Sequence, residues 1–187
     1  MSKVQEYISG LTECLNELSP HDIEEVAGII VDAWKKGKQV FVMGNGGSAT
    51  TASHFARDLQ IGTASVGKPR VRACSLADSI AFITAVGNDI DYSAVFEEQL
   101  VGQLEKGDVV IGITCSGDSP NVLRAIEYAS RNGATTIGVI GFGGGKLKAM
   151  VDKSIVLSSS DYRQLEDAHL GVAHIISYLV EERIANG

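Results

Sequence analysis

Cysteine is scarce in this sequence, and long apolar runs are missing. Three of the 187 residues are cysteines, and Cys14, Cys74 and Cys115 lie far apart without C-x-x-C spacing. This odd, scattered set argues against a disulfide framework and fits reduced thiols. No stretch approaches the ~18 apolar residues of a membrane-spanning helix, and the charged N-terminus lacks the apolar region of a signal peptide. We therefore expect a cytoplasmic protein without a membrane partner.

Clusters of basic residues are also missing. Lysine and arginine together number 16 against 23 aspartates and glutamates, so the net charge is −7. Binding to a nucleic-acid backbone depends on many basic contacts, which argues against nucleic acid as the main partner. A local basic pocket for a small anion is still compatible with this composition.

The length and composition predict one globular domain. Domains commonly have ~100–200 residues. Hydrophobic residues make up 44% of this chain, enough for a substantial core, and no repeat, low-complexity stretch or linker divides it. We expect a single domain over residues 1–187, with N-terminal helices in residues 1–36.

Five short apolar segments alternate with helical patterns after these N-terminal helices. The predicted strands are QVFVMG, RVRACSL, DVVIGIT, TTIGVIG and KSIVLSS. Runs of valine and isoleucine are typical of parallel strands that are buried on both faces. Strands that alternate with helices favour right-handed crossovers and a layered α/β fold. The expected fold is α/β, a flavodoxin-like, doubly wound sheet of five parallel strands.

Apolar spacing predicts the helices. They are expected over 3–18, from Ser19-Pro20 to near Gly37, and over 47–60, 78–86, 92–104, 119–131, a short one from about 145, and 161–185. Serine before proline is a plausible N-cap followed by the first helical position. We expect the segment GND, residues 87–89, to break the chain between two helices.

A glycine-rich loop, Gly44 to Ser48, follows the first predicted strand and opens a helix. Ligands of such sheets bind beyond the carboxyl ends of the strands. Free backbone N–H groups and the helix dipole favour an anion there. The loop is neither a Walker loop, since no lysine follows, nor a G-x-G-x-x-G fingerprint, since Ala49 stands at the last position. Taken alone, a tight turn explains it equally well.

A hydroxyl-rich loop follows the third predicted strand. Thr114, Ser116 and Ser119 occur within six residues before another helix start. An N-cap needs one hydroxyl, whereas several hydroxyls suit a phosphate held at a helix N-terminus. Two such loops on adjacent strands predict a pocket for a sugar phosphate.

Ionisable residues gather on two predicted helices. His54 and Asp58 are four residues apart and share a helix face, and Glu166 and His174 are eight apart on the last helix. His174 alone, among apolar neighbours, is more often a core residue. Two histidines with two carboxylates can hold a divalent metal such as Zn²⁺, or they can supply a general base and acid. The residues leave both alternatives open.

Asn88 and Asp89 lie in the expected helix break. They can cap a helix or bind a sugar hydroxyl, and capping is the more common role of such residues.

These motifs together resemble the sugar isomerase (SIS) domain family. The segments that carry the resemblance are GNGGSATTASHFARDL, TAVGND, GDVVIGITCSGDSPNVLRAIEYA and QLEDAHLGVAHII. Within the family the chain is most similar to phosphoheptose isomerases, and the resemblance covers nearly its whole length. It implies an aldose–ketose isomerase that converts sedoheptulose 7-phosphate to D-glycero-D-manno-heptose 7-phosphate, or acts on a close relative, through an enediol.

The resemblance also implies roles for individual residues. The residues it assigns to substrate binding are Asn45, Gly46, Gly47, Ser48, Asn88, Asp89, Thr114, Cys115, Ser116 and Ser119. Asp58 or Glu166 would be the base and His174 the acid. Some members carry zinc, which here would bind one per site to His54, Asp58, Glu166 and His174. The family is usually a homotetramer with sites at subunit contacts, to which the helices of residues 1–36 would contribute.

Several residues depart from the family pattern, including Thr114 and Cys115 where the family has serine and threonine, and three of the departures are acidic residues. Asp58 replaces a glutamate, Glu166 replaces a glutamine, and Asp118 brings a negative charge to the hydroxyl-rich loop. The shorter Asp58 matters because errors of about 1 Å in position can cost ~10²-fold in rate. The alternative function is a non-catalytic sugar-phosphate-binding or regulatory SIS protein, as in regulators of replication initiation. Catalysis is favoured because both histidines and two carboxylates are retained.

Overall fold

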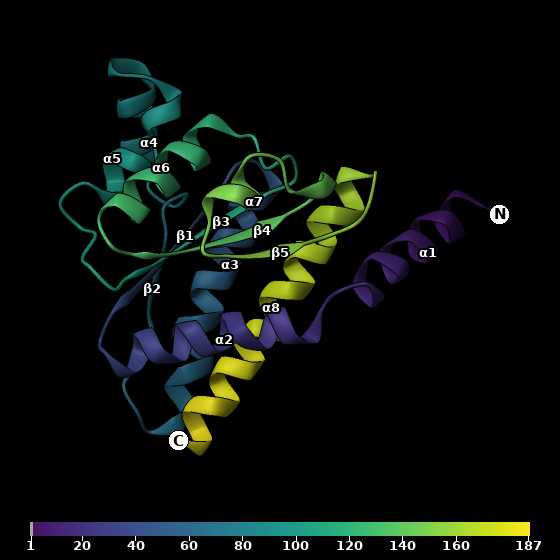
Figure 1. The fold of residues 1–187 in the computed structure, drawn as a ribbon, viewed down its shortest axis with the longest axis horizontal. Coiled ribbons are helices and arrows are strands. Elements are labelled where there is room, and N and C mark those ends of the chain that lie inside the picture. The colour runs from purple at the N-terminus through teal and green to yellow at the C-terminus, as the bar shows by residue number, and fades with distance from the viewer. Residues whose placement is uncertain (1) are drawn as a thin grey trace.

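The fold is built on one parallel sheet, which confirms the predicted α/β class (Figure 1). The computed structural model describes residues 2–187, without the side chains of residues 65 and 66. The strands are β1 (Gln39–Gly44), β2 (Arg72–Ser75), β3 (Val109–Thr114), β4 (Thr135–Ile140) and β5 (Lys153–Val156). All neighbouring pairs are parallel, in the order β2-β1-β3-β4-β5. Each segment predicted as a strand contains one of them.

Helices precede, connect and follow the strands. They are α1 (Lys3–Asn16), α2 (Pro20–Lys35), α3 (Gly47–Gly62), α4 (Ile80–Asp89), α5 (Glu97–Leu100), α6 (Pro120–Arg131), α7 (Leu147–Met150) and α8 (Tyr162–Asn186). Short 3₁₀ turns are η1 (Thr63–Val66), η2 (Tyr92–Ala94) and η3 (Phe142–Gly144). The Ser19 hydroxyl accepts a hydrogen bond from Asp22 N at 3.3 Å and Pro20 begins α2, as predicted. In residues 2–187, no helix is long and apolar enough to cross a membrane.

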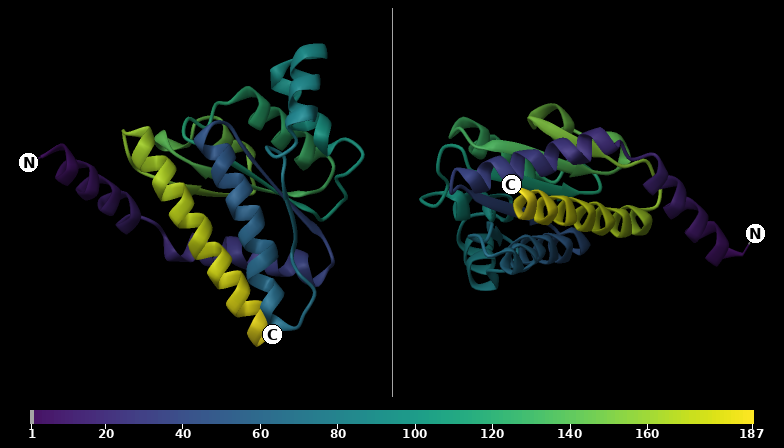
Figure 2. Two further views of the ribbon diagram at one scale, coloured as in Figure 1. Left: turned by 180° about the vertical axis from the view of Figure 1, so that it is seen from behind. Right: turned by 90° about the horizontal axis from the view of Figure 1, so that it is seen from below.

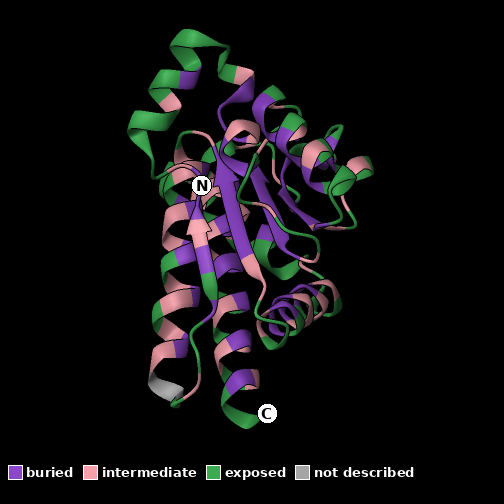
Figure 3. Ribbon diagram, turned by 90° about the vertical axis from the view of Figure 1, so that its left-hand side faces the viewer, coloured by how far each residue is buried: buried purple, intermediate pink, exposed green. Residues whose placement is uncertain are grey.

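The side chains of the strands alternate between two hydrophobic cores. Val40 and Val42 pack with α2, α3 and α8 on one face, whereas Phe41 and Met43 pack with α4, α6 and α7 on the other. Figure 2 shows α3 and α8 running side by side over their face of the sheet. The strands in Figure 3 are largely buried, which explains their continuous valine and isoleucine.

The predicted break at residues 87–89 is wrong. Helix α4 continues through Gly87, Asn88 and Asp89, because the N–H groups of Ile90 and Asp91 both still bond to Val86 O, at 2.9 and 3.0 Å. The predicted helix over 92–104 is wrong as well. It is replaced by the turn η2, which the Asp91 carboxylate begins by accepting from Ser93 N at 2.7 Å, and by the single turn α5.

The carboxyl ends of β1 and β3 lie next to each other at the centre of the sheet. Gly44 is in register with Ile113. The chain runs from β1 to one side and from β3 to the other, so the strand order reverses here. Such a reversal is where ligands of open α/β sheets bind.

Candidate active site

A pocket of about 240 Å³ lies at this reversal. Its walls are Asn45, Ser48, Ile113, Thr114, Cys115, Ser116, Ser119, Phe142, Tyr162 and Glu166. The glycine-rich loop and the hydroxyl-rich loop, which are about 70 residues apart in the sequence, therefore meet at one cavity, because β1 and β3 are neighbours.

Three hydroxyls form a compact group on one wall. Thr114 Oγ1 lies 3.4 Å from Ser116 Oγ and 3.3 Å from Ser119 Oγ. Ser119 occupies the N-cap position of α6, yet its side chain makes no capping hydrogen bond. Its hydroxyl lies against Thr114 Oγ1 instead. Several hydroxyls beside a helix N-terminus form a favourable setting for a phosphate.

Asp118 does not oppose an anion in this pocket. Its Oδ1 atom accepts a hydrogen bond from Lys146 N at 3.2 Å, and the residue is not part of the pocket wall. Its own N–H donates to Ser116 Oγ at 3.2 Å, which helps to orient that hydroxyl.

The start of α3 also lines this pocket, through Ser48. Gly46 has a φ of +56°, a conformation that suits glycine, and α3 has no side-chain cap. The first N–H groups of a helix lack partners within the helix, so here they are free for a ligand. Ser48 is buried beside them. A Cβ atom at Gly47 would collide with the Glu166 carboxylate, so the glycine allows this close approach.

Asn45 is held by two residues that the sequence analysis missed. Asn45 Nδ2 donates to Asn121 Oδ1 at 2.9 Å, and Asn121 Nδ2 donates back to Asn45 Oδ1 at 2.8 Å. The Tyr92 hydroxyl also donates to Asn45 Oδ1 at 3.1 Å. Asn121 follows the Ser-Pro helix start directly, a weak local signal, whereas nothing in the sequence indicates Tyr92.

A second group, the histidine cluster, consists of His54, Asp58 and His174. Asp58 Oδ2 lies 3.2 Å from His54 Nε2 and 3.6 Å from His174 Nε2. One ligand atom from each residue lies within 4.8 Å of the others. Two imidazole nitrogens and one carboxylate oxygen match a catalytic zinc site, which keeps a fourth position open.

The fourth expected metal ligand lies elsewhere. Glu166 is not part of the histidine cluster and lines the hydroxyl-rich pocket. The helical spacing of Glu166 and His174 does not bring their side chains to one point. Asp58, in contrast, is additionally paired with Arg57, whose Nη2 lies 2.9 Å from Asp58 Oδ1.

Asn88 and Asp89 stand apart from both groups. Both are exposed in the last turn of α4, and the Asn88 amide donates to Asp89 Oδ1 at 2.7 Å. Neither lines the pocket in this chain.

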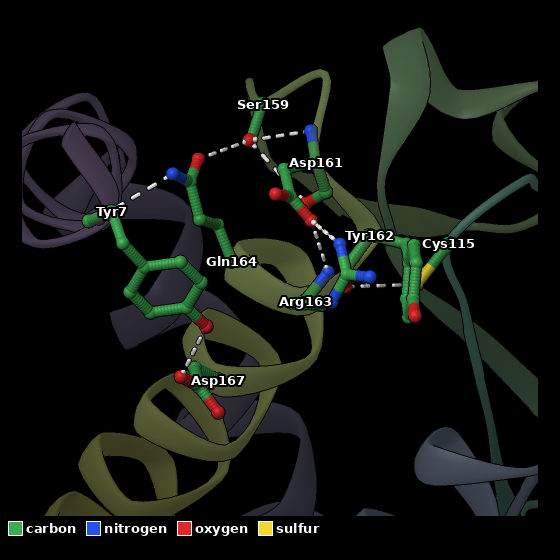
Figure 4. Close-up of polar contacts among 8 residues, drawn as sticks. All are labelled: Tyr7, Cys115, Ser159, Asp161, Tyr162, Arg163, Gln164 and Asp167. Carbon is green, nitrogen blue, oxygen red and sulfur yellow. Dashed lines mark hydrogen bonds and ion pairs between the residues drawn. The ribbon is translucent and has the colours of Figure 1, made fainter. Parts of the chain in front are cut away.

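Cys115 is a pocket residue with a protonated thiol. Its Sγ atom lies 4.0 Å from the Tyr162 carbonyl oxygen, as Figure 4 shows. Burial, with a smaller contribution from the Glu166 charge, raises the pKa of Cys115 to about 11. Because the thiolate is the nucleophile, Cys115 is not one near neutral pH.

Helix α1 is tied to the start of α8 close to this pocket (Figure 4). The Tyr7 hydroxyl donates to Asp167 Oδ2 at 2.7 Å, and this hydrogen bond is the main reason why the pKa of Tyr7 rises to about 12. The Gln164 amide donates to Tyr7 O at 3.4 Å and accepts from Ser159 Oγ at 2.7 Å.

Comparison with known proteins agrees with this geometry. The SIS domain family matches residues 5–141. This chain belongs to the SIS domain family. A phosphoheptose isomerase of Citrifermentans bemidjiense is 37% identical to this SIS protein, over 93% of this chain and 90% of the relative. A phosphoheptose isomerase of Geobacter metallireducens is 39% identical, over 89% of this chain and 87% of the relative.

Solved structures of the same kind superpose on this SIS protein. A phosphoheptose isomerase from Francisella tularensis has a TM-score of 0.88 and 30% identity, covering 96% of this chain and 94% of its own. A phosphoheptose isomerase from Neisseria gonorrhoeae has a TM-score of 0.84 and 26% identity, and the match covers 96% of this chain and 95% of the other.

Proposed function

We propose that this protein is a phosphoheptose isomerase that converts sedoheptulose 7-phosphate to D-glycero-D-manno-heptose 7-phosphate. Its relatives with that name match nearly its whole length. The structural observation that carries the proposal is that the two loops meet at one pocket, which Glu166 also lines.

The phosphate binds to the hydroxyls of Ser48, Thr114, Ser116 and Ser119. The N–H groups at the starts of α3 and α6 and of Cys115 complete the cradle. Asn45 hydrogen-bonds the sugar chain, in an orientation set by Asn121 and Tyr92. Asn88 and Asp89 do not reach this pocket within one chain, so their contact with sugar requires a second subunit.

Without a bound metal, Asp58 acts as the base and His174 as the acid. The base takes a proton from C1 of the ketose while the acid protonates the oxygen on C2, which yields the enediol. Return of a proton to C2 and loss of one from the C1 hydroxyl give the aldose, with no net change of atoms or electrons. The two groups must lie close together because they serve adjacent atoms, and Asp58 Oδ2 is 3.6 Å from His174 Nε2.

The histidine cluster also suits one Zn²⁺ per site. When bound, the metal would polarise the carbonyl and stabilise the enediolate. His54, Asp58 and His174 would then be its ligands, which leaves Glu166 as the free carboxylate that can act as the base. The carboxylate that moves the proton therefore depends on whether metal is present.

The protein forms a homotetramer with its sites at subunit contacts, and the whole chain, residues 1–187, is one SIS domain. Exposed apolar side chains on three helices support such contacts. They are Val4 and Ile8 on α1, Ile80 and Phe82 on α4, and Ile175 and Tyr178 on α8. The helices of residues 1–36 take part in these contacts. Three free cysteines fit a cytoplasmic location.

The direct test is incubation of the purified protein with sedoheptulose 7-phosphate in D₂O. We expect the aldose product by NMR, with deuterium at C2 where the enediol exchanged its proton with solvent. The Asp58→Asn variant is the control. Absence of product at high protein concentration, with and without Zn²⁺, would refute the assignment. Saturable substrate binding without turnover would instead support the regulatory alternative.

A further inference from the structure

A second cavity lies at the opposite edge of the sheet, at the amino ends of β1 and β2. Its volume is about 530 Å³. It is lined by Trp34, Lys35, Gly37, Lys38, Pro69, Arg70 and Arg72. Ligand sites commonly measure about 300–1,000 Å³. This cavity is therefore large enough for a small molecule and is separate from the sugar-phosphate pocket.

The cavity is basic, although the chain is acidic overall. Four of its seven lining residues are cationic and none is acidic, whereas the net charge of the chain is −7. Two of the cations have protein partners that hold them in place. Lys38 Nζ lies 3.1 Å from Glu105 Oε2, and Arg72 Nη1 donates to Gly37 O at 3.1 Å.

The other two cations, Lys35 and Arg70, have no side-chain partner in the described part of the chain. A cation in the last turn of α2 complements the helix dipole, which is sufficient to explain Lys35. It does not explain Arg70, which comes from the segment between η1 and β2. Lys35 and Arg70 are exposed and line one cavity from two segments of the chain, which favours an anionic ligand there.

Trp34 gives the cavity a fixed aromatic wall. Its indole Nε1 donates to Pro69 O at 2.7 Å, which ties the ring to the segment that carries Arg70. The residue is half-buried. A flat ring held in this way offers a surface on which another aromatic ring can stack.

We propose that this cavity binds a nucleotide. The phosphate groups pair with Arg70 and Lys35, and the base packs against Trp34. Inorganic phosphate and sugar phosphates lack an aromatic ring, so they could pair with the cations but could not stack on Trp34. Binding is non-covalent and does not involve the isomerase pocket.

The test uses the protein's single tryptophan as a reporter. ADP is titrated into the full-length protein while tryptophan fluorescence and, separately, binding heat are recorded. We expect saturable binding with a dissociation constant of about 1 mM or lower, and at least about 10-fold weaker binding of adenosine or phosphate alone. Arg70→Ala should weaken ADP binding about 10-fold, since one charge-assisted hydrogen bond is lost. Arg131→Ala, which removes an exposed arginine at the end of α6, is the matched control and should not weaken ADP binding.

Three results would overturn the proposal. One is the absence of both a fluorescence change and binding heat. Another is equal ADP affinity in the wild type, Arg70→Ala and Lys35→Ala. The third is displacement of ADP by sedoheptulose 7-phosphate, which would assign the binding to the sugar-phosphate pocket. The Ser116→Ala variant should retain the ADP response whether or not the protein is an isomerase, so the two proposals fail independently.

Discussion

The Nε2 atoms of His54 and His174 lie 3.2 Å apart, although 120 positions separate the residues in the chain. Helices α3 and α8 pack side by side and bring the rings edge to face, with centroids 4.9 Å apart. Two imidazole nitrogens this close either form a hydrogen bond, in which one donates and the other accepts, or bind one metal ion.

Zinc binding should depend on this pair. We expect the wild-type protein to hold about one Zn²⁺ per chain after dialysis, measured by elemental analysis. His54→Ala and His174→Ala should each lose it, since two remaining donors make a poor zinc site. His21→Ala, an exposed histidine on α2, is the control and should retain the metal. Stoichiometric zinc in His174→Ala would exclude the histidine cluster as the metal site.

The choice of base should depend on the metal. In metal-free protein, Asp58→Asn should lower kcat by about 10³-fold, whereas Glu166→Gln should have a smaller effect. In zinc-loaded protein, Glu166→Gln should cause the larger loss. Both substitutions nearly preserve side-chain shape, so turnover compares the carboxylates directly. Equal kcat in the wild type and both variants would contradict the assignment of either as base.

The three neighbouring hydroxyls of Thr114, Ser116 and Ser119 should determine the affinity for the substrate. Ser119→Ala and Ser116→Ala each remove a donor to the phosphate, and we expect KM for sedoheptulose 7-phosphate to rise about 10-fold. Ser119 makes no capping hydrogen bond, so stability should hardly change. Ser130→Ala, exposed at the other end of α6, is the matched control. If Ser119→Ala instead destabilises the fold and leaves KM unchanged, its role is capping.

His169 should make stability fall in acid. It is buried, neither ring nitrogen has a partner among the described residues, and burial lowers its pKa to about 4. Between the unfolded pKa of about 6.5 and this value, the unfolded chain binds a proton that the folded chain rejects, so stability declines as pH falls. From pH 7 to 4.5 this group should cost about 2 kcal/mol.

Urea unfolding at both pH values measures that cost. His169→Leu should show a correspondingly smaller loss than the wild type, while His21→Leu should behave like the wild type. An unchanged pH dependence in His169→Leu would mean that His169 is not the group responsible.

The exposed apolar side chains on α1, α4 and α8 should hold the subunits together. A tetramer of the 19.8 kDa chain has a mass of four times that value, about 79 kDa, which light scattering after gel filtration measures. Ile80 is 74% exposed on α4, and α4 is the largely exposed helix at the top of Figure 3. Ile80→Glu should lower the mass because a buried charge is costly at an interface. Val101→Glu, exposed outside these helices, is the control, and a monomeric wild type would refute the assembly.

Local sequence was sufficient to predict the strands and most of the helices. The apolar runs around Val40 and Ile111 predicted strands because burial on both faces leaves a continuous pattern. The loop that begins at Gly44 and the group of hydroxyls near Ser116 were recognisable because turn and anion-binding chemistry uses adjacent residues. The glycine at position 87 does not break the helix as its sequence suggests, since the helix hydrogen bonds continue two residues beyond Asp89.

The sequence by itself therefore determined the sheet, its two ligand-binding loops and the kinds of side chain available for chemistry. Only the tertiary structure decided their partners. It placed Glu166 against Gly47 instead of beside His174, and it joined Asn45 to Asn121. It also brought Arg70 and Trp34 to one cavity at the far edge of the sheet. Periodicity reports which face of an element is buried, whereas the contacts between elements depend on the packing of distant segments, which local spacing does not encode.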